Sequence, residues 1–592
     1  MSYEASKKQA GRKPLTVIEC DFDSCGRSFG VSPCTASGAP GTECYNTFAT
    51  CQDAPNYLKT IKTVRFFEQF ANLPAGVEGF PCLDGAPSLA PTKILPDKGL
   101  GYRGAVSVSL KDFPHHDRGL DPYVSTRNYK ADKQGTFFGK LLSRNPFYQG
   151  RAMRVRTGFI NTPFSWSDFE DRTYVIEKID VLDNTGKVKI SAKDLLKLAD
   201  DKRAQAPAPS EGTLAADITA GAGSLSLVAG KGAAYPTAGT YRIGDEIGTY
   251  TRAGDVVTLT SRNEWGTTAV EHKAGDLFQD CLVYNAANVV DIIHGLLTDY
   301  ASIDETNIPY DAGLGTPTGT ADEWDLEKAD WLSANDLSMV VSKPTGIMKL
   351  LQEITEQNLC YIWWDEVSAK IKLKAIAPTL KNEIPPALND TSHVIEKSIS
   401  VMDSPDDRIT ELWVYYDKID HSDDNKAENF RALKIQIDTD AESVNAYGDK
   451  RVKTIYANWL SATNAGLVTT LAGRLLNRYS ATPKKIKFSL DAKDTVIWTG
   501  SSATLTTNKI QGIDGAALVQ KLQVLQVKET KPGHRYDYEA ISFDYGFDRY
   551  AFIAPNTMGN YTVESEANQT AYGFISQNNG QYTNGDAGHL IA

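Results

Sequence analysis

Residues 174–191 read YVIEKIDVLDNTGKVKIS, and this stretch decides the fold class of the first part of the chain. Its flanks, residues 174–182 and 187–191, are rich in the β-branched residues valine and isoleucine, and the Asp-Asn-Thr-Gly sequence between them is typical of a turn. The pattern predicts a β-hairpin. Upstream, residues 105–110 alternate so that Val106, Val108 and Leu110 share one face, which predicts another strand. We therefore expect a mainly β first region.

Downstream of this hairpin the composition shifts to a Pro/Ala linker at residues 204–210. Beyond it, to about residue 280, short alternating runs at 224–228, 241–247 and 255–260 are separated by glycine-rich turns. This spacing predicts a small β-sandwich or barrel inserted into the main body.

The next block has the pattern of an α/β region. Residues 288–300 carry apolar side chains at helical spacing, and a second helix is predicted from near Ser342 with Pro344 in its first turn. Residues 360–373 predict a hairpin that turns at 365–369. We interpret its Trp363 and Trp364 as core packing rather than a binding platform.

The last region is predicted to be β-rich with one strong helix at residues 465–479, with Arg474 and Arg478 on its solvent face. Strands are expected at 485–490 and 518–527, with a turn at 512–515. The fold class is thus a multidomain chain, mainly β with α+β domains. The expected regions are a cysteine module (1–100), a β-rich domain (101–205), the inserted β domain (206–282), an α/β domain (283–392), a β-rich domain with a long helix (393–548) and a C-terminal arm (549–592).

Length, composition and charge restrict the possible functions. A chain of 592 residues exceeds one core, and 41% hydrophobic with 23% charged residues is ordinary for a soluble globular protein. We expect no transmembrane segment and no secretory signal, since no long apolar run is present and the N-terminus has no apolar core region. A net charge of −12 argues against a nucleic-acid-binding surface and fits one that DNA passes without sticking.

Residues 25–51, CGRSFGVSPCTASGAPGTECYNTFATC, hold half of the eight cysteines: Cys25, Cys34, Cys44 and Cys51. The segment has no helical or strand period and little apolar material, so it needs a cross-link or a bound ion to hold a shape. Its C-x8-C-x9-C-x6-C spacing matches neither zinc-ribbon knuckles nor the cysteine run of bacterial ferredoxins. Three interpretations stay open on the spacing: an iron–sulfur cluster, a structural Zn²⁺, or two disulfides.

The other four cysteines have different surroundings. Cys20 and Cys82 are near enough in sequence to replace a ligand, whereas Cys281 and Cys360 lie in apolar stretches and are expected to be ordinary buried residues.

Catalytic signatures of hydrolases, P-loop NTPases, zinc peptidases and dinucleotide-binding enzymes are absent from the sequence. The adjacent His115 and His116 have no other metal-ligand residues at useful spacing, and Asp406-Asp407 and Asp423-Asp424 have the pattern of solvated turns. We therefore expect a protein that is not an enzyme.

Several long motifs resemble the baseplate-hub, or minor tail, proteins of long-tailed, non-contractile bacteriophages. The motifs are FGVSPCTA (29–36), ECYNT (43–47), ATCQD (49–53), DPYVSTR (121–127), GTFFGK (135–140), RNPFYQG (144–150), AKDLLKLADD (192–201) and YAFIAPN (550–556). The resemblance covers most of the chain, interrupted by the insertion at 208–280.

This resemblance implies a homotrimeric hub that closes the distal end of a tail tube, in a virion assembled in the cytoplasm of a bacterial host. It would contact the distal tail protein, the tape measure protein and a central fibre or receptor-binding protein, while DNA passes through its channel without specific binding. Related tail-tip proteins of lambda-like phages and gene transfer agents carry iron–sulfur clusters, which favours a cluster, most simply 4Fe–4S, on Cys25, Cys34, Cys44 and Cys51. The alternatives are an iron–sulfur redox protein with accessory β domains and a tail protein that binds carbohydrate or degrades cell wall.

Overall fold

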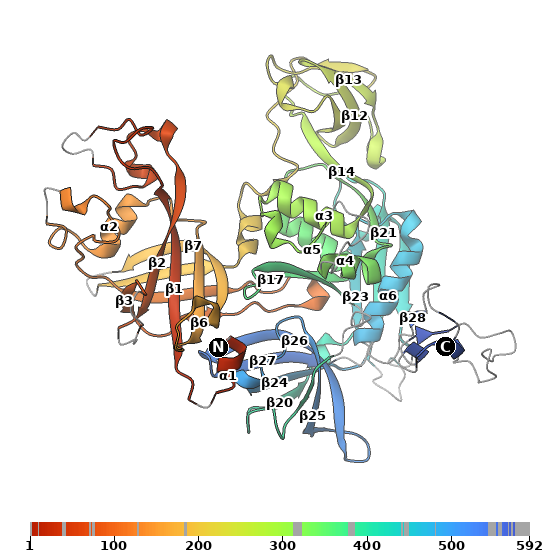
Figure 1. Ribbon diagram of the computed structural model, residues 1–592. Helices are drawn as coiled ribbons and strands as arrows, with labels where there is room; N and C mark the ends of the chain where they lie inside the picture. The colour runs from red at the N-terminus through yellow and green to blue at the C-terminus, as the bar shows by residue number, and fades with distance from the viewer. Residues whose placement is uncertain are drawn as a thin grey trace.

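The computed structural model describes the larger part of the chain (Figure 1). The described residues are 3–9, 11–37, 43–69, 73, 77–126, 130–182, 186–311, 323–376, 385–439, 442, 449–479, 481–542, 552–553, 559, 561–565, 568–569 and 572–574. The expected C-terminal arm at 549–592 falls largely outside them. A mainly β chain with α/β parts is confirmed.

The first region is a β-barrel. Its strands in the described chain are β1 (Pro14–Cys25), β2 (Lys59–Glu68), β3 (Phe80–Leu83), β4 (Ser88–Ala90), β5 (Ala105–Lys111), β6 (Ala152–Phe159), β7 (Phe169–Leu182) and β8 (Lys187–Lys193). They follow the order β3-β2-β1-β6-β7-β8-β5-β4, and β3 also pairs with β5 through Leu83 and Leu110. That last pairing closes seven of the strands into a barrel and leaves β4 as an edge strand beside β5.

The sequence-predicted hairpin is confirmed as β7 and β8, which pair in antiparallel register with Val181 opposite Val188. Val106, Val108 and Leu110 of β5 point into the barrel core, and helix α2 (Phe137–Arg144) adds Phe137 and Phe138 to the same core. The expected boundary at residue 100 lies inside this barrel, between β4 and β5, because strands from both sides of it are hydrogen-bonded in one sheet.

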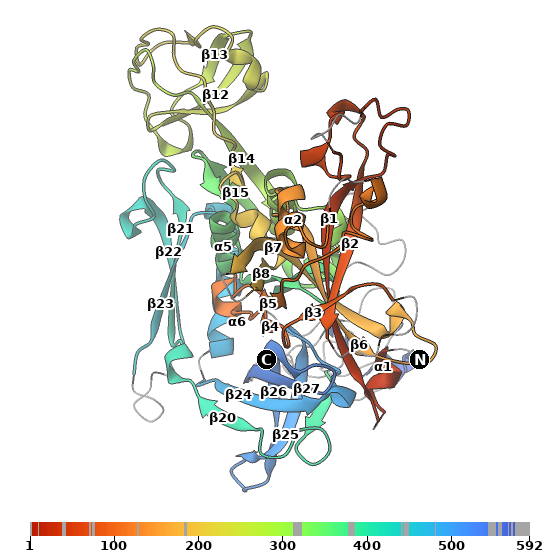
Figure 2. The ribbon, with the colours of Figure 1, turned by 90° about the vertical axis from the view of Figure 1, so that its left-hand side faces the viewer.

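The inserted module has its own core around Tyr241, Tyr250 and Phe278. Its strands are β10 (Ser224–Ser226), β11 (Ala238–Ile243), β12 (Glu246–Ala253) and β13 (Val256–Ser261). The single strand predicted at 241–247 is wrong, because a turn with Gly244 at φ +58° folds this stretch back as the β11–β12 hairpin. The strand β14 (Gln279–Asn288) pairs with β11 and then with β15 (Asp336–Val341), so it joins the module to the main body (Figures 1 and 2).

A second contact anchors the module to the body. The backbone N–H of His421 donates to the carbonyl oxygen of Trp265 at 3.1 Å, and the two rings meet edge to face with centroids 5.0 Å apart. Gly266 follows at φ +79°, where a Cβ would lie 1.7 Å from the carbonyl oxygen of Ile419. Only glycine permits this close approach.

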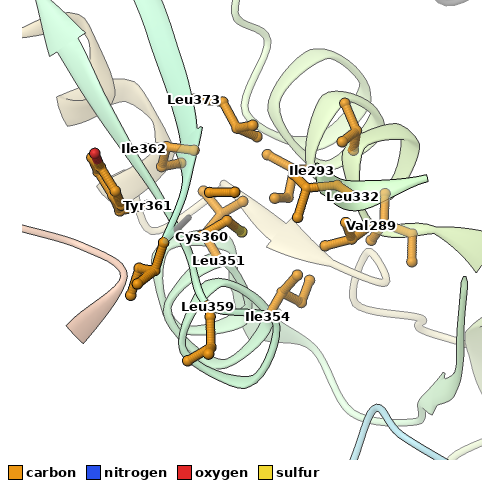
Figure 3. Packing of buried hydrophobic residues seen from close by; sticks show 14 of the residues in the cluster. Val289, Ile293, Leu332, Leu351, Ile354, Leu359, Cys360, Tyr361, Ile362 and Leu373 are labelled. Carbon is orange, nitrogen blue, oxygen red and sulfur yellow. The ribbon is translucent and has the colours of Figure 1, made fainter. Parts of the chain in front are cut away.

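The central α/β region contains α3 (Val289–Gly295), α4 (Glu323–Glu327), α5 (Ile347–Gln357), β16 (Thr345–Gly346), β17 (Cys360–Asp365) and β18 (Lys370–Ala375). Figure 3 shows Val289, Ile293, Leu351 and Ile354 converging with Cys360 in its core. Trp363 and Trp364 are buried in this core as predicted.

The helix predicted from near Ser342 begins later, at Ile347. The reason is a tertiary pairing that the local pattern does not contain: Thr345 and Gly346 form β16, which pairs with β9 (Gln205–Ala206).

The β17–β18 hairpin contacts the barrel. Trp364 Nε1 donates to the carbonyl oxygen of Thr173 at 2.9 Å, and the Thr173 N–H donates to the carbonyl oxygen of Glu366 at 3.0 Å. The Glu366 carboxyl is buried near that of Asp194, and burial raises the pKa of each to about 7.

The C-terminal part consists of two sheets and α6 (Ala465–Tyr479), whose bounds match the prediction. One sheet has the order β22-β21-β23, from β21 (Glu411–Lys418), β22 (Phe430–Ile437) and β23 (Val452–Ala457). The other has the order β19-β25-β26-β27-β24-β20, from β19 (Ala387–Asn389), β20 (Ser400–Asp403), β24 (Lys484–Asp491), β25 (Ser502–Gln511), β26 (Ala517–Lys531) and β27 (Arg535–Ser542). The remaining short elements are α1 (Tyr3–Lys7), β28 (Phe552–Ile553) and β29 (Tyr572–Gly573).

The solvent face predicted for α6 is wrong at Arg478, which is buried and donates to the Gln523 side chain on β26. Arg474 places its guanidinium 5.3 Å from the centroid of the Trp331 ring. Both arginines therefore contact neighbouring elements instead of facing water alone.

A buried ion pair joins the barrel to the C-terminal sheet. Arg172 on β7 contacts Glu529 on β26, and both side chains are 2% exposed. Arg172 also donates to Glu170 at 2.7 Å, while Glu529 accepts from the Gly533 N–H at 2.7 Å and from the Tyr536 hydroxyl at 2.9 Å. Within the described residues, no helix has both the length and the apolar character needed to cross a membrane.

Candidate metal centre

The four clustered cysteines lie at one end of the β1–β2 hairpin. Cys25 is the last residue of β1 and pairs with Lys59, the first residue of β2, so the described residues 26–37 and 43–58 form a long excursion from the end of this hairpin. Cys34, Cys44 and Cys51 all belong to the excursion, which rises from the barrel (Figures 1 and 2). We call residues 25–58 the cysteine loop.

The fold brings the cysteine segments together: the Cys25 N–H donates to the Asn46 carbonyl oxygen at 2.7 Å, and the Thr35 N–H donates to the Asp53 carboxylate at 2.7 Å. The pKa of the Cys44 thiol is raised by partial burial and by the nearby thiols of Cys51, Cys25 and Cys34. Burial, with contributions from Asp23, Cys25 and Cys51, raises the pKa of Tyr57 to about 12, so this phenol belongs to the same site. All four cysteines are partly exposed. A metal that binds here would replace the thiol protons, because thiolates are the ligands.

Backbone N–H groups donate to two of the sulfurs. The Arg27 N–H lies 3.5 Å from Cys25 Sγ, and the Asn46 N–H lies 3.4 Å from Cys44 Sγ. Asn46 also accepts the Cys25 N–H at its carbonyl oxygen, 2.7 Å away, and it takes φ +56° to do so. Such N–H donors stabilise charge on a thiolate and fix its direction, as outer-sphere partners do at metal sites.

Two further donors at the site have no acceptor. Nε of Arg27 and the hydroxyl of Tyr57 are buried and have no hydrogen-bond partner among the residues that the structure describes. A buried donor without a partner costs about 1–3 kcal/mol, and native structures contain few of them. Acceptor atoms of a bound group would satisfy both donors.

Side-chain hydrogen bonds fasten the loop where Cys34 approaches Cys51. The Asp53 carboxylate accepts the Thr35 N–H at 2.7 Å, the Thr35 hydroxyl at 2.9 Å and the Asn56 amide at 3.2 Å. These hydrogen bonds lower the pKa of Asp53, so the carboxylate stays ionised and holds the two cysteine segments together.

The cysteine loop has little apolar burial of its own, as the sequence predicted. The side chains of Val31, Phe48 and Leu58 are all exposed. The loop rests on the segment around α2 instead, where Phe48 meets Phe147 at 6.4 Å and the Arg144 guanidinium lies 4.2 Å from the Tyr45 ring centroid.

The other cysteines are not part of this site. Cys20 and Cys82 are buried in the barrel core, where burial raises both thiol pKa values, so neither lies with the clustered four. Their position in the barrel core therefore argues against a ligand set in which Cys20 or Cys82 replaces one of the clustered cysteines. Cys281 and Cys360 are buried among apolar side chains, as predicted.

Four cysteines are the donor set of an iron–sulfur cluster and also of a structural zinc ion. Among the described residues, no three His, Cys, Asp or Glu side chains are gathered as closely as a single metal ion requires. An iron–sulfur cluster is held by cysteine thiolates, and its sulfurs accept hydrogen bonds. The convergent thiols and the unpartnered donors of Arg27 and Tyr57 suit that requirement.

Sequence reasoning did not single out Arg27, Asn46, Asp53 or Tyr57. Asn46, two residues after Cys44, was a weak signal of a turn beside the site, since asparagine tolerates positive φ. Of the histidine pair, His115 packs edge to face against Phe80 at 5.2 Å and accepts the Asp117 N–H at 3.0 Å, so it serves the local packing.

Comparison with protein families and with curated proteins finds no match to this chain. Comparison with solved structures finds phage-tail proteins and related assemblies. A tail protein of Neisseria meningitidis is 10% identical with a TM-score of 0.37, covering 78% of this chain and 91% of that one. The 43 kDa tail protein of a Shewanella oneidensis prophage is 10% identical with a TM-score of 0.35, covering 74% and 89%. An Escherichia coli component of the type VI secretion system is 7% identical with a TM-score of 0.33, covering 81% and 80%.

Proposed function

We propose that this chain is a structural protein of a bacteriophage tail, the hub at the distal end of the tail tube, and that Cys25, Cys34, Cys44 and Cys51 bind an iron–sulfur cluster. Its copies would assemble as a homotrimer in the virion, after synthesis in the cytoplasm of a bacterial host. Its neighbours would be the distal tail protein, the tape measure protein and a central fibre or receptor-binding protein.

The observation that carries the proposal is the assembly of the cysteine segments at the end of the β1–β2 hairpin, where the Cys25 N–H donates to the Asn46 carbonyl oxygen and the Thr35 N–H donates to the Asp53 carboxylate. The motifs FGVSPCTA, ECYNT and ATCQD, which carry the resemblance to hub proteins, lie on this loop and include three of the four cysteines. The role of the loop and the role of the thiols are therefore linked. At the tip of a particle the cysteine loop must keep its shape, and the exposed side chains of its described residues give it little apolar core, so the thiols would have to hold it.

The chain's own residues would hold the group in three ways. The four sulfurs supply the ligands, the N–H groups of Arg27 and Asn46 stabilise charge on two of them, and the Asp53 hydrogen bonds keep the ligand segments in place. A bound cluster would supply a cross-link between four points of the loop. We propose this structural role, with Zn²⁺ or two disulfides as the alternatives.

A hub at the end of the tail tube would also surround the channel through which DNA passes, and the overall charge supports this role. At a net charge of −12 the protein repels phosphate, so DNA would pass without being held.

Tail assembly with a matched pair of variants tests the proposal. Cys34→Ser removes a proposed ligand, whereas Cys360→Ala removes a buried thiol of the central core at a cost of roughly 1 kcal/mol. We expect incomplete tails with Cys34→Ser and normal tails with Cys360→Ala, and we expect an antibody to the wild-type chain to label the tail tip in electron micrographs. Label along the whole tube would contradict the hub role. Normal tails with both Cys34→Ser and Cys44→Ser would contradict the role of the cysteines in it.

A further inference from the structure

Within the part of the chain that the structure describes, the sheet β22-β21-β23 has one face covered by other elements and one exposed face. Leu412, Val414, Ile455 and Ala457 point to the covered side, where α6 packs and where they are buried in the central core. In Figure 2 the three strands stand at the left-hand side of the molecule, with α6 on their inner side. The residues that alternate with these four therefore face outward.

The outward face is apolar. It consists of three rows that follow the strand register: Ile437, Glu411 and Val452; Ile435, Trp413 and Thr454; Leu433, Tyr415 and Tyr456. The exposed fractions are 42% for Leu433, 42% for Ile435, 41% for Ile437, 45% for Val452 and 37% for Tyr456. Tyr415 and Tyr456 stack with their centroids 5.3 Å apart. We call these nine residues the outer face; Glu411 is its one buried member, 2% exposed, and its carboxylate accepts the Trp413 Nε1–H at 3.0 Å.

An outer strand face in water is normally polar, since antiparallel sheets alternate apolar inward and polar outward positions. On β22 the outward positions are Arg431, Leu433, Ile435 and Ile437, so three consecutive outward side chains are aliphatic. A contiguous exposed patch of this kind marks an interaction surface.

The charges on and beside the outer face are paired within the chain. Glu411 contacts Lys450 at one end, and Arg431 lies 3.6 Å from Asp417 at the other. Copies of a protein with a net charge of −12 repel one another, and they meet at least electrostatic cost where the surface charges are balanced. This neutrality argues that the partner of the outer face is a second copy of the chain.

The same chain carries a second bare apolar surface that projects. The tip of the β25–β26 hairpin presents Ile513, which is fully exposed, with Leu518 and Val519 beside it at 48% and 56% exposed. The charges of Lys509 and Asp514 balance at this tip. In Figure 2 the hairpin points downward from the C-terminal sheet.

We propose that the outer face is a self-association surface and that the β25–β26 hairpin tip of a neighbouring copy covers it. One flat and one projecting apolar surface at different places on a chain form a heterologous contact, which closes into a ring when the rotation between copies permits. This inference adds the contact surfaces to the proposed hub assembly. It rests on the proposed function only for the place where the copies would meet, which is the virion. Self-association is measured on the isolated chain and tail function in particles, so one can fail without the other.

Mass measurement at increasing protein concentration tests the surface. We expect the wild-type chain to form an oligomer and Ile435→Lys to weaken self-association by about 30-fold, because a charge would replace a central apolar contact. Val256→Lys is the matched control, since this valine on β13 of the inserted module is 52% exposed and lies outside both surfaces. Circular dichroism checks that both variants fold. A monomeric wild-type chain, or an Ile435→Lys oligomer as stable as the control, would overturn the proposal.

Photo-crosslinking tests the pairing of the two surfaces. With benzoylphenylalanine in place of Ile513, irradiation of mixed light and isotopically heavy chains is expected to give light–heavy cross-links to residues 433–437. Light–heavy cross-links only to other parts of the chain, or no light–heavy cross-links at all, would overturn the assignment of the hairpin tip as the occupant.

Discussion

Replacing Arg172 with methionine is expected to loosen the junction between the barrel and the C-terminal sheet. Arg172 and Glu529 are each 2% exposed and lie on β7 and β26, which belong to different sheets. Removing one partner leaves the Glu529 carboxylate buried with only the Gly533 N–H and the Tyr536 hydroxyl as donors. Breaking a buried pair in this way costs about 3–5 kcal/mol.

Hydrogen exchange of peptides from β7 and β26 measures this loss directly, because a chain with several domains need not unfold in one step. A loss of about 3 kcal/mol raises the exchange rate of amides that open with the junction by ~100-fold. The double variant Arg172→Met with Glu529→Gln removes the unpaired charge and is expected to recover part of the protection.

Arg535→Met provides the control, since Arg535 and Asp537 form a 3.0 Å ion pair on β27 that is 41% and 39% exposed. An exposed pair contributes about 0.2–1 kcal/mol, so exchange in the control should change little. Equal exchange in Arg172→Met and in Arg535→Met would refute the argument that the buried pair holds the two sheets together.

Three further changes have defined outcomes. Burial near Asp194 raises the pKa of Glu366 to about 7, so the stability that its protonated form contributes is present below about pH 4.5 and is lost as the pH rises to about 7. Glu366→Gln should therefore flatten the pH dependence of the melting temperature between these two pH values. An unchanged dependence would contradict the burial of this carboxyl. Gly266→Ala places a Cβ against the Ile419 carbonyl and should speed proteolysis between residues 206 and 282, whereas unchanged digestion would mean that this contact does not anchor the module. Tyr57→Phe removes an unpartnered donor and should lower the reduction potential of a bound cluster without changing its iron content; an unaltered potential would mean that the hydroxyl does not face the cluster.

Local patterns sufficed where neighbouring residues decide the structure. The alternation in 105–110 predicted strand β5, and the turn between the Val/Ile-rich flanks of 174–191 predicted β7 and β8. The apolar spacing of 465–479 predicted α6 with its bounds. These elements present one apolar face to a core, and this face is visible in the sequence.

Predictions failed where distant segments decide the outcome. Thr345 and Gly346 became a strand by pairing with residues 205–206, and Arg478 was buried by Gln523 of another sheet. The contact of β3 with β5 that closes the barrel is likewise a long-range pairing without a local signal.

The candidate site divides along the same line. Cysteine spacing and the lack of apolar residues indicated the four-thiol loop, because both are properties of the local sequence. The unpartnered donors of Arg27 and Tyr57 and the exclusion of Cys20 and Cys82 depend on how β1, β2 and β3 assemble, so they needed the fold.

Iron and acid-labile sulfide content of the anaerobically purified chain, read with its visible spectrum, tests the central claim most directly. The account predicts iron and sulfide at cluster stoichiometry and a brown colour that is lost in Cys34→Ser and kept in Cys360→Ala. Zinc without sulfide, or thiols that react with alkylating reagents only after reduction, would contradict it: the first would mean a single structural ion and the second two disulfides.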